Sequence, residues 1–402
     1  MGPKFESTFG SAFAIIEEIE RKGGEAFIVG GSVRDYLSGS EVGDIDIATS
    51  EPPKRIQEIF EKVIPVGIEH GTVLVRYDGE SYEVTTYRTE KGYQDYRHPD
   101  EVTFVKDIKE DLARRDFTMN AIAMDRHGEI VDPYKGRQAI EKKEINAVGN
   151  PTERFQEDPL RMMRAVRFAS QLNFSIESRT KLSILEQVDL LSYVSIERIA
   201  EETIKLYKGK GFKLGLKLIT DLGLKPYLPQ LNKIDLIRTI PYVSLQTWPE
   251  VIAYYTSAYS EAGVKEWVKE WKLSNRSKRN TEALLNGLQE YERNSKLTQW
   301  LLYNLPSYLY PSFSRLIRAC INIDDHLLQK MEEEKFHLPI QARNDLAFQA
   351  KDLLLLYPDL KKGPWISETM EKVEYAVVTS EIPNEFEKIK EWVSKWNPPA
   401  NS

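Results

Sequence analysis

Two aspartates one residue apart, Asp44 and Asp46, are the residues most suited to chemistry in this chain. The pattern predicts a β-strand over residues 44–48, where alternate side chains share a face and both carboxylates project together. Carboxylates that close repel each other unless a cation lies between them. Mg²⁺ takes oxygen ligands, often one or two carboxylates together with substrate phosphates. Alone, such a pair also occurs in glycosyltransferases and on solvated strand ends, so neighbouring residues must decide between these uses.

A glycine turn directly before the aspartates suits a phosphate group. Gly30 and Gly31 let the backbone approach phosphate oxygens, and Arg34 adds a bidentate donor. The alternative is a plain strand–helix turn capped by Ser32. We expect Arg34 in the first helical turn, where a cation opposes the helix dipole, and this placement favours a phosphate-binding role. Together the turn and the aspartates indicate nucleotidyl transfer.

Further charged residues add to this set. Glu83, on a strand predicted over residues 81–87, could bring a third carboxylate beside the aspartates, or it could simply face solvent. Arg114 and Arg115 are predicted at the start of an apolar helix, where they make sense if they face a triphosphate or the aspartates. Asn120, in the same segment, could bind a ribose hydroxyl or cap a neighbouring group, and both roles stay open.

A second cluster lies on a predicted helix that begins near Pro159. Pro159 suits the first helical position, so Asp158 is the expected N-cap. Arg161, Arg164 and Arg167 recur every three residues and share one broad face. A solvated basic face is one interpretation of this pattern, and recognition of a nucleobase edge is the other.

Base recognition by Asp158 and Arg161 would be selective. Cytosine and adenine both present an amine donor beside a ring-nitrogen acceptor, which an aspartate and an arginine match. Uracil and guanine present a carbonyl beside a ring N–H, so both protein groups would stay unpaired at about 1–3 kcal/mol each. Arg164 and Arg167 would then contact phosphates or orient the selective pair.

Composition sets the broad class. The chain has 402 residues, enough for two or more domains, with 41% hydrophobic and 29% charged residues as in ordinary globular proteins. One cysteine, Cys320, excludes an intramolecular disulfide and suits a cytoplasmic protein. No leader-like N-terminus or membrane-length apolar run is found. The net charge of −7 means that a nucleic acid would have to meet local basic patches.

The first 150 residues alternate strand-like and helix-like segments, and the rest is dominated by helical periodicity. Asp78-Gly79 predicts a short hairpin turn between strands over 72–77 and 81–87. The polar stretch 88–100 is expected to be irregular, before a strand over 102–105. The remaining expected elements are helices over 5–22, after 52–53 and over 136–143, strands over 26–29 and 130–131, and an extended segment over 145–148.

The motifs together resemble one enzyme family. In order, the motifs are residues 30–35, Asp44 with Asp46, residues 114–121, residues 132–136, residues 157–168 and residues 195–202. This series resembles the class II tRNA nucleotidyltransferases, and most of all the bacterial CCA-adding enzymes of the Bacillus type. Each motif is weak alone, and their shared order makes the resemblance specific.

The resemblance implies an α+β fold in four parts. An N-terminal nucleotidyltransferase α/β head (1–150) would precede an elongated all-helical neck (151–215, nucleotide-selecting), body (216–300) and tail (301–402, tRNA-binding). Template-independent addition of C, C and A to tRNA 3′ ends from CTP and ATP would be the activity, with two Mg²⁺ ions. The residues that it implies are Asp44 and Asp46, which would bind metal, and Gly31, Arg34, Arg115, Asp158, Arg161, Arg164 and Arg167, which would bind the nucleotide. Glu83 is added to the catalytic residues from its predicted strand position.

Partners follow from the same resemblance, namely tRNA and the two nucleotides, no membrane, and a possible homodimer. Two basic runs are plausible contacts for tRNA phosphates, although they could be solvated helix faces. Aromatic residues between them are expected in the core. The basic residues are Lys205, Lys208, Lys210, Lys213 and Lys217, then Lys265, Lys269, Lys272, Arg276, Lys278 and Arg279; the aromatic residues are Tyr207, Phe212, Trp267 and Trp271.

Other activities stay open. Partial enzymes add only CC or only A, but CC-adding members lack part of a loop that is complete here over 88–101, with Tyr93, Asp95, Arg97 and His98. Poly(A) polymerases share the head and usually have a longer basic C-terminus, whereas residues 396–402 are not basic. A non-catalytic RNA-binding protein is a further alternative, which the retained aspartates and Arg115 oppose. None of the five histidines forms the His-Asp pair of a phosphohydrolase.

Overall fold

A computed structural model gives the fold and describes residues 3–93, 95–97, 99–259, 261–321, 323 and 326–395, without the side chains of residues 3–7 and 91. His98 and residues 396–402, both used in the predictions above, lie outside the described residues. The chain divides into two compact units, Met1–Arg238 and Thr239–Ser402.

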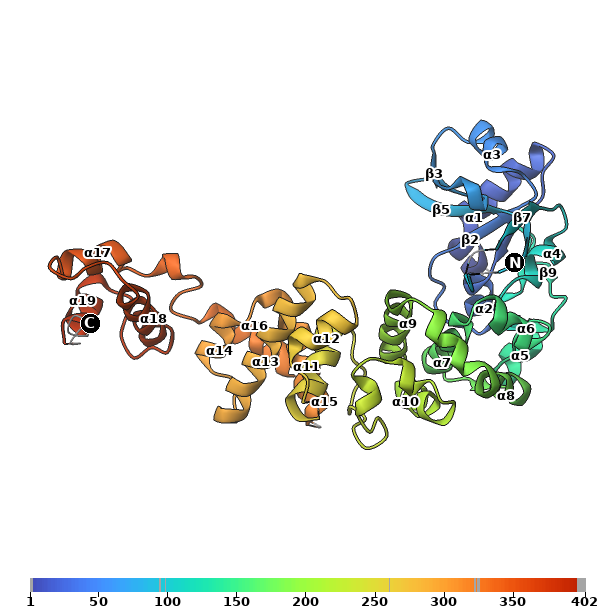
Figure 1. Ribbon diagram of the computed structural model, residues 1–402. Coiled ribbons are helices and arrows are strands. Elements are labelled where there is room, and N and C mark those ends of the chain that lie inside the picture. Colours follow the sequence, from blue (N-terminus) through green and yellow to red (C-terminus); the bar gives the residue numbers. More distant parts are fainter. Residues whose placement is uncertain are drawn as a thin grey trace. The chain divides into compact units, whose positions relative to one another are not determined.

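The first unit contains a seven-stranded sheet in the order β3-β4-β5-β2-β1-β8-β9 (Figure 1). Neighbouring strands are antiparallel except β2 and β5, which are parallel. Two smaller sheets pair β6 with β7 and β10 with β11. The strands are β1 Ala26–Val29, β2 Asp46–Thr49, β3 Val63–Gly67, β4 Thr72–Tyr77, β5 Glu80–Thr86, β6 Arg88–Lys91, β7 Glu101–Phe104, β8 Ala123–Met124, β9 Ile130–Val131, β10 Glu144–Ile145 and β11 Ser175–Ile176.

The β4–β5 hairpin forms as its turn predicts. Tyr77 pairs with Glu80, so Asp78 and Gly79 are the two turn residues. Their φ angles are +50° and +82°. Two positive φ angles define the primed turn whose twist matches the strands on either side, and Asp-Gly is among the pairs that adopt it most readily.

Two local predictions about strands were wrong. β2 begins at Asp46, so Asp44 precedes the strand and does not share its alternation. The stretch 88–100 is not wholly irregular, because its first four residues form β6 and pair with β7. β6 and β7 therefore form a two-stranded arm, with Arg88 opposite Phe104 and Lys91 opposite Glu101. The polar sequence did not indicate this register.

Both faces of the main sheet are covered, but one only in part. Helices α1 and α3 contact strands of the sheet, and apolar residues such as Ile28, Ile47 and Val84 are buried. On the other face Phe27, Ala48 and Tyr87 join a core cluster that includes two residues of α4. Asp46 shares the face of Ala48, because the two residues are two positions apart along β2. The carboxylate is thus fixed at the edge of a packed core.

Helices complete the first unit. Helices α1, α3 and α5 confirm the predictions over 5–22, after 52–53 and over 136–143, with bounds that differ by at most two residues. The helices are α1 Pro3–Arg21, α2 Gly31–Leu37, α3 Pro53–Ile59, α4 Ile108–Ala113, α5 Gly136–Lys142, α6 Pro151–Glu157, α7 Leu160–Leu172, α8 Ser178–Gln187, α9 Ile196–Lys208 and α10 Phe212–Asp221. Short 3₁₀ turns include η1 Ile68–His70, η2 Thr118–Asn120 and η3 Val188–Tyr193.

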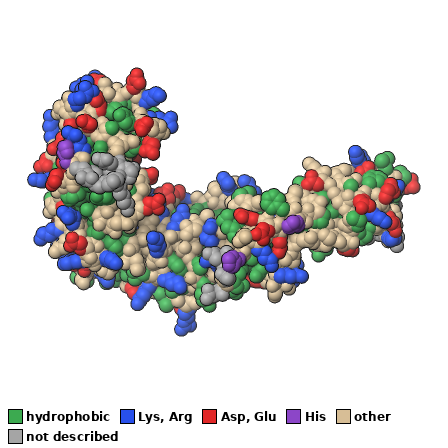
Figure 2. Space-filling view, turned by 180° about the vertical axis from the view of Figure 1, so that it is seen from behind, with side chains coloured by type: hydrophobic (Ala, Val, Ile, Leu, Met, Phe, Trp, Pro, Cys, Tyr) green, Lys and Arg blue, Asp and Glu red, His purple; other side chains and the backbone are tan. Residues whose placement is uncertain are grey.

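Among the described residues of the second unit, helices are the only regular secondary structure. Its helices are α11 Trp248–Ala258, α12 Val264–Glu270, α13 Asn275–Asn294, α14 Gln299–Asn304, α15 Tyr310–Cys320, α16 Leu327–Phe336, α17 Ala350–Leu356, α18 Trp365–Val378 and α19 Phe386–Ser394. Trp267 and Trp271 are buried here, as are Tyr207 and Phe212 in the first unit, so the core placement of all four aromatic residues is confirmed. Acidic and basic side chains are mixed over the face shown in Figure 2.

The predicted α+β class is confirmed, with the sheet at the N-terminal end and helices after it. One detail differs, because residues 151–215 are not all-helical: β11 pairs in parallel with β10. The four-part division at residues 150, 215 and 300 stays a prediction.

Gly136, the first residue of α5, lies close to the backbone of η2. A Cβ added to Gly136 would lie 2.2 Å from the carbonyl oxygen of Thr118 in η2. We expect Gly136→Ala to destabilise the protein by about 1–3 kcal/mol, since backbone must move to admit the methyl group. Gly10→Ala is the matched control: Gly10 is exposed in α1 with nothing within 4 Å of the added Cβ. It should stabilise by about 0.5–1 kcal/mol. Urea unfolding of both variants measures the difference, and equal effects would contradict it.

Candidate active site

One cavity of about 800 Å³ in the first unit collects all ten predicted site residues. Asp46 of β2 and Glu83 of β5 are direct partners in the parallel register, so the sheet places the two carboxylates side by side. Asp44 lines the same cavity although it precedes β2. The cavity lining contains Gly31, Arg34, Asp44, Asp46, Glu83, Arg115, Asp158, Arg161, Arg164 and Arg167.

The carboxylates repel one another in this arrangement. Burial raises the pKa of Asp46 to about 6; Glu83 and Asp44 add to the rise, and Arg115 opposes it. The side chain remains open to the cavity, so a cation can reach it. A cation between these carboxylates would reverse the effect of their mutual repulsion, because it favours the charged forms.

The residues fit a metal ion that is shared with a substrate. Among the described residues, no three carboxylate, histidine or cysteine side chains stand close enough to hold a metal ion by themselves. Mg²⁺ rarely requires such a cage, because it keeps several waters and binds one or two carboxylates together with phosphates. Asp44 and Asp46 match that smaller donor set.

The glycine turn lies beside the carboxylates. Gly30 has a φ of +76°, and a Cβ there would lie 2.9 Å from Nη1 of Arg115, so both its conformation and its neighbour require glycine. Ser32 does not cap α2 as one interpretation suggested, because Oγ of Ser32 donates to the carbonyl oxygen of Val29 instead. Arg34 is the fourth residue of α2 rather than part of its first turn, so the helix-dipole argument for it was wrong.

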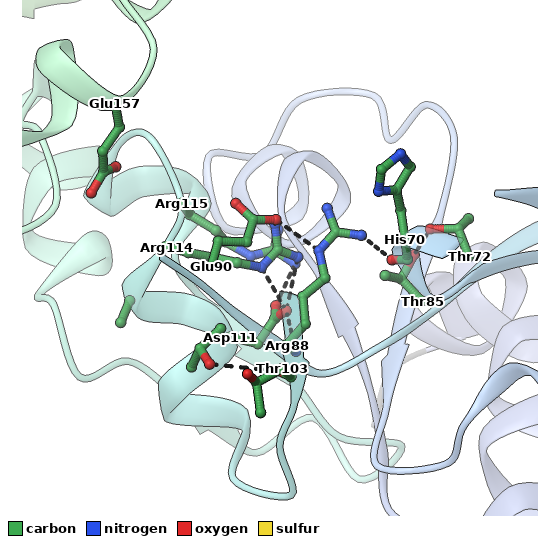
Figure 3. Close-up of polar contacts among 12 residues, drawn as sticks. His70, Thr72, Thr85, Arg88, Glu90, Thr103, Asp111, Arg114, Arg115 and Glu157 are labelled. Carbon is green, nitrogen blue, oxygen red and sulfur yellow. Dashed lines mark hydrogen bonds and ion pairs between the residues drawn. The ribbon is translucent and has the colours of Figure 1, made fainter. Parts of the chain in front are cut away.

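Arg114 and Arg115 follow the end of α4 and do not begin a helix as predicted. A cation is favourable there, because the C-terminal end of a helix carries partial negative charge. Buried Asp111 binds both guanidinium groups, at 2.8 Å from Nη2 of Arg114 and 3.2 Å from Nη2 of Arg115 (Figure 3). Arg114 also lies 3.3 Å from Glu90 of β6, which ties the arm to the cavity wall.

Arg115 is short of negative charge. Burial lowers the pKa of its guanidinium in spite of Asp111, and its Nε has no hydrogen-bond partner among the described residues. An anionic ligand in the cavity would supply the missing charge. This is the electrostatic observation that best supports a triphosphate site here.

A chain of polar contacts crosses the cavity wall. Nη1 of Arg34 donates to Asn120 at 2.7 Å, and the amide nitrogen of Asn120 donates to Asp116 at 3.2 Å. Arg164 binds the other carboxylate oxygen of Asp116 through Nε at 2.7 Å. Both ends of the Asn120 amide are therefore engaged, which favours its structural role over ribose binding.

Asp116 provides a stability test of this chain of contacts. Burial alone would raise the pKa of Asp116, but Arg164 and Asn120 hold it at about 2, below its ordinary 3.8. We expect Asp116→Ala to destabilise the protein by about 3 kcal/mol at pH 7, because it leaves Arg164 without its partner. The depressed pKa means that the contribution is complete above about pH 4 and is lost as the pH falls toward 2.

Urea unfolding between pH 3 and pH 7 measures this loss. Glu58→Ala is the control, because the Glu58–Arg55 pair is exposed and should contribute less than about 0.5 kcal/mol. A gap between Asp116→Ala and wild type that widens on acidification would contradict the assignment.

Arg161 of α7 and Asp158, which lies between α6 and α7, are the predicted base-recognition residues, and both line the cavity. The structure assigns the N-cap to Pro159 rather than Asp158, yet Oδ1 of Asp158 accepts the Leu160 N–H at 3.1 Å and so performs the capping. Oδ2 of Asp158 accepts from Arg198 at 2.8 Å. Nη1 of Arg161 binds Glu157 at 2.7 Å. Asp158 and Arg161 are thus each oriented by another residue and keep capacity for a ligand.

The alternative of a solvated basic face for α7 is wrong. Arg161 and Arg167 are buried, and Arg167 pairs with Glu202 of α9 at 2.5 Å. The guanidinium carbon of Arg167 also lies 3.7 Å from the centre of the Phe168 ring. Such contacts orient these arginines and do not leave them to water.

Several cavity residues were not selected from the sequence. Arg198 and Phe168 stood inside recognised motifs, which was the available signal for them. Thr72, Thr85 and Arg88 gave none, because ordinary strand residues carry no motif. The residues of this kind that line the cavity and could meet a ligand are Thr72, Thr85, Arg88, Phe168 and Arg198; Arg114 and Lys205, both named from the sequence, line it as well.

Comparison with known proteins identifies the family. Residues 26–146 match the poly A polymerase head domain, and residues 244–393 match domain 2 of the tRNA nucleotidyltransferases. A CCA-adding enzyme of Anoxybacillus flavithermus is 45% identical over 389 residues, which cover 96% of each chain. The chain belongs to the CCA-adding enzyme family. One of Oceanobacillus iheyensis is 42% identical and covers 98% of this chain and 99% of its own.

The fold agrees with this family. The crystal structure of the Bacillus stearothermophilus CCA-adding enzyme in complex with CTP has a TM-score of 0.87 and 35% identity, and the match covers 98% of both chains. The predicted resemblance to Bacillus-type CCA-adding enzymes is therefore confirmed. Among the described residues, no helix combines the length and the apolar character needed to cross a membrane.

Proposed function

We propose that this member of the CCA-adding enzyme family adds C, C and A to the 3′ end of tRNA from CTP and ATP, without a template, and releases pyrophosphate. The observation that carries the proposal is one cavity lined by Asp44, Asp46 and Glu83 together with Asp158 and Arg161, the proposed base-recognition pair. A relative 35% identical to this chain was solved with CTP. The chemistry and the selection of the nucleotide would therefore take place in one compartment.

The divalent cations belong to this proposal. Asp44 and Asp46 would hold two Mg²⁺ ions, and Glu83 would stand beside them as a third carboxylate. Magnesium bound there would neutralise charge on the triphosphate and would lower the pKa of the attacking hydroxyl. The raised pKa of Asp46 supports this assignment, since that carboxylate lacks a compensating positive charge.

The nucleotide residues divide into two groups. The backbone at Gly31 and the guanidinium groups of Arg34 and Arg115 would bind the triphosphate, where Arg115 lacks negative charge. Asp158 and Arg161 would bind the pairing edge of the base. Arg164 and Arg167 are engaged by carboxylates of the protein, which supports an orienting role for them. The chain's contribution is then positioning and fixed charge around an in-line attack of the tRNA 3′-hydroxyl on the α-phosphate.

Binding of tRNA would use shape and phosphate contacts. The basic runs from Lys205 to Lys217 and from Lys265 to Arg279 are the proposed surfaces, and Lys205 also lines the cavity. A homodimer and a cytoplasmic location stay predictions. Both agree with the family, and neither is needed for the chemistry proposed.

Nucleotide incorporation tests the proposal. Transcripts that lack the CCA end, stop after its second C, or are complete would be incubated with CTP, ATP or both, and Mg²⁺. We expect CC and then one A, with no extension of the complete tRNA. CC alone or A alone would identify a partial enzyme, and an open-ended A tail a poly(A) polymerase. Binding without incorporation would indicate a non-catalytic RNA-binding protein.

A further inference from the structure

Two threonine hydroxyls face each other on the wall of the cavity. Thr72 of β4 and Thr85 of β5 are register partners, and their Oγ1 atoms lie 3.1 Å apart. Both side chains are half-buried, and both line the cavity. Figure 3 shows the pair on neighbouring strands, close to Arg88 and His70. One hydroxyl proton joins the two oxygens, so the second proton and further lone pairs remain for a ligand.

The pair shares a sheet face with the carboxylates. Glu83 and Thr85 are two residues apart on β5, hence about 7 Å apart along one face. Asp46 is the register partner of Glu83 on the next strand. A ribose whose 3′-oxygen lies at the carboxylates would bring its neighbouring 2′-hydroxyl within hydrogen-bonding reach of Thr85.

The order of the strands decides which substrate lies there. The sheet runs β4-β5-β2-β1, so Asp46 of β2 stands between the threonine pair on β4 and β5 and the Gly30–Gly31 turn that follows β1. The turn and Arg34 belong to the triphosphate side of the proposed site. In-line transfer places the attacking oxygen opposite the leaving pyrophosphate. The 3′ end of the tRNA must therefore approach the carboxylates from the side of β5 and β4.

We propose that Thr72 and Thr85 bind the 2′-hydroxyl of the terminal nucleotide of the tRNA and so select a ribose end. The inference rests on the proposed nucleotidyl transfer. A 2′-hydroxyl both donates and accepts, and it is the group that distinguishes RNA from DNA. The threonine pair offers both a donor and an acceptor to it. Arg88 lines the cavity beside the pair, where its guanidinium is held by Glu90 of β6 at 2.7 Å.

A chemical double-mutant cycle tests this inference. Two tRNA transcripts ending after the second C would be compared, one with a terminal ribose and one with a terminal 2′-deoxyribose, with ATP as the added nucleotide. We expect wild type to extend the ribose end about tenfold faster than the deoxyribose end. Thr85→Val should slow the ribose end by about tenfold and leave the deoxyribose end unchanged, so that discrimination disappears.

Two further variants keep the test decisive. Thr72→Val acts from the other strand and should also remove the discrimination. Thr86→Val is the control: Thr86 lies on the opposite face of β5, and its hydroxyl donates to the carbonyl oxygen of Glu51. It should preserve the tenfold preference even if it lowers stability. Equal slowing of both ends by Thr85→Val and Thr72→Val, or an unchanged preference, would overturn the inference. Failure of wild type to extend the ribose end would instead overturn the proposed function.

Discussion

Asp46→Asn is expected to lower the rate of nucleotide addition by at least about 10³-fold while tRNA binding stays nearly unchanged. The substitution keeps the shape of the side chain and removes the charge that would hold Mg²⁺ between Asp46 and its partners. Metal stabilisation of the transferring phosphoryl group is worth several kcal/mol, which corresponds to that factor. Single-turnover incorporation of CTP into a tRNA lacking its CCA end measures the rate.

The same variant should not be less stable than wild type. Burial raises the pKa of Asp46 to about 6 from 3.8, so the charged carboxylate opposes folding in the metal-free protein. This unfavourable contribution is absent below about pH 4 and complete above about pH 6. Asp46→Asn should therefore match wild type in Tm at pH 4 and exceed it at pH 8, with metal chelated.

Asp78→Asn is the matched control for both measurements. Asp78 occupies the hairpin turn at a φ of +50°, which asparagine tolerates, and it does not line the cavity. Its activity and the pH dependence of its Tm should follow wild type. Retention of a tenth or more of the activity by Asp46→Asn would contradict the metal assignment, whereas a lower Tm at pH 8 would contradict the electrostatic one.

Asp158→Ala is expected to relax nucleotide selection. The carboxylate of Asp158 would accept from the amine of cytosine or adenine, and its removal leaves no protein group to oppose the carbonyl oxygen of uracil. We expect the preference for CTP over UTP to fall by about tenfold to 10²-fold. The measurement is the ratio of kcat/KM for the two nucleotides on one tRNA transcript.

The ratio is the appropriate readout because this variant also disturbs the helix start. Leu160 loses the acceptor for its N–H, and Arg198 loses an ion-pair partner, so some stability is lost. Both nucleotides meet the same folded protein, and the stability change cancels in the ratio. Asp221→Ala, at an exposed position at the end of α10, should leave the ratio unchanged. Unchanged discrimination against UTP in Asp158→Ala would refute base recognition by this residue.

Local chemistry in the sequence was sufficient for much of the fold. The Asp78-Gly79 turn fixed a hairpin register, and the apolar segment 26–29 became β1 with the expected bounds. The ten site residues selected from the sequence motifs all line one cavity. Failures occurred where local propensity was weak. Asp44 lies outside β2, and the short helix α4 before Arg114 was not expected.

Long-range pairing was the part that sequence could not provide. Arg164 binds Asp116 across 48 positions, Arg167 binds Glu202 and Arg198 binds Asp158. Each arginine had several possible carboxylate partners in the chain, and only tertiary structure selects among them. The proposed role of Thr72 and Thr85 could not be predicted for a related reason. It depends on which strands pair beside the carboxylates, and local sequence does not show this.

We propose that side chains alone, without a template, select C, C and A for a tRNA end. Sequencing of product 3′ ends tests it most directly, after a tRNA transcript lacking CCA is incubated with all four nucleotides and Mg²⁺. We expect ends that stop at CCA, with U and G rare at every added position. Frequent U or G, or A tails of open length, would contradict the claim.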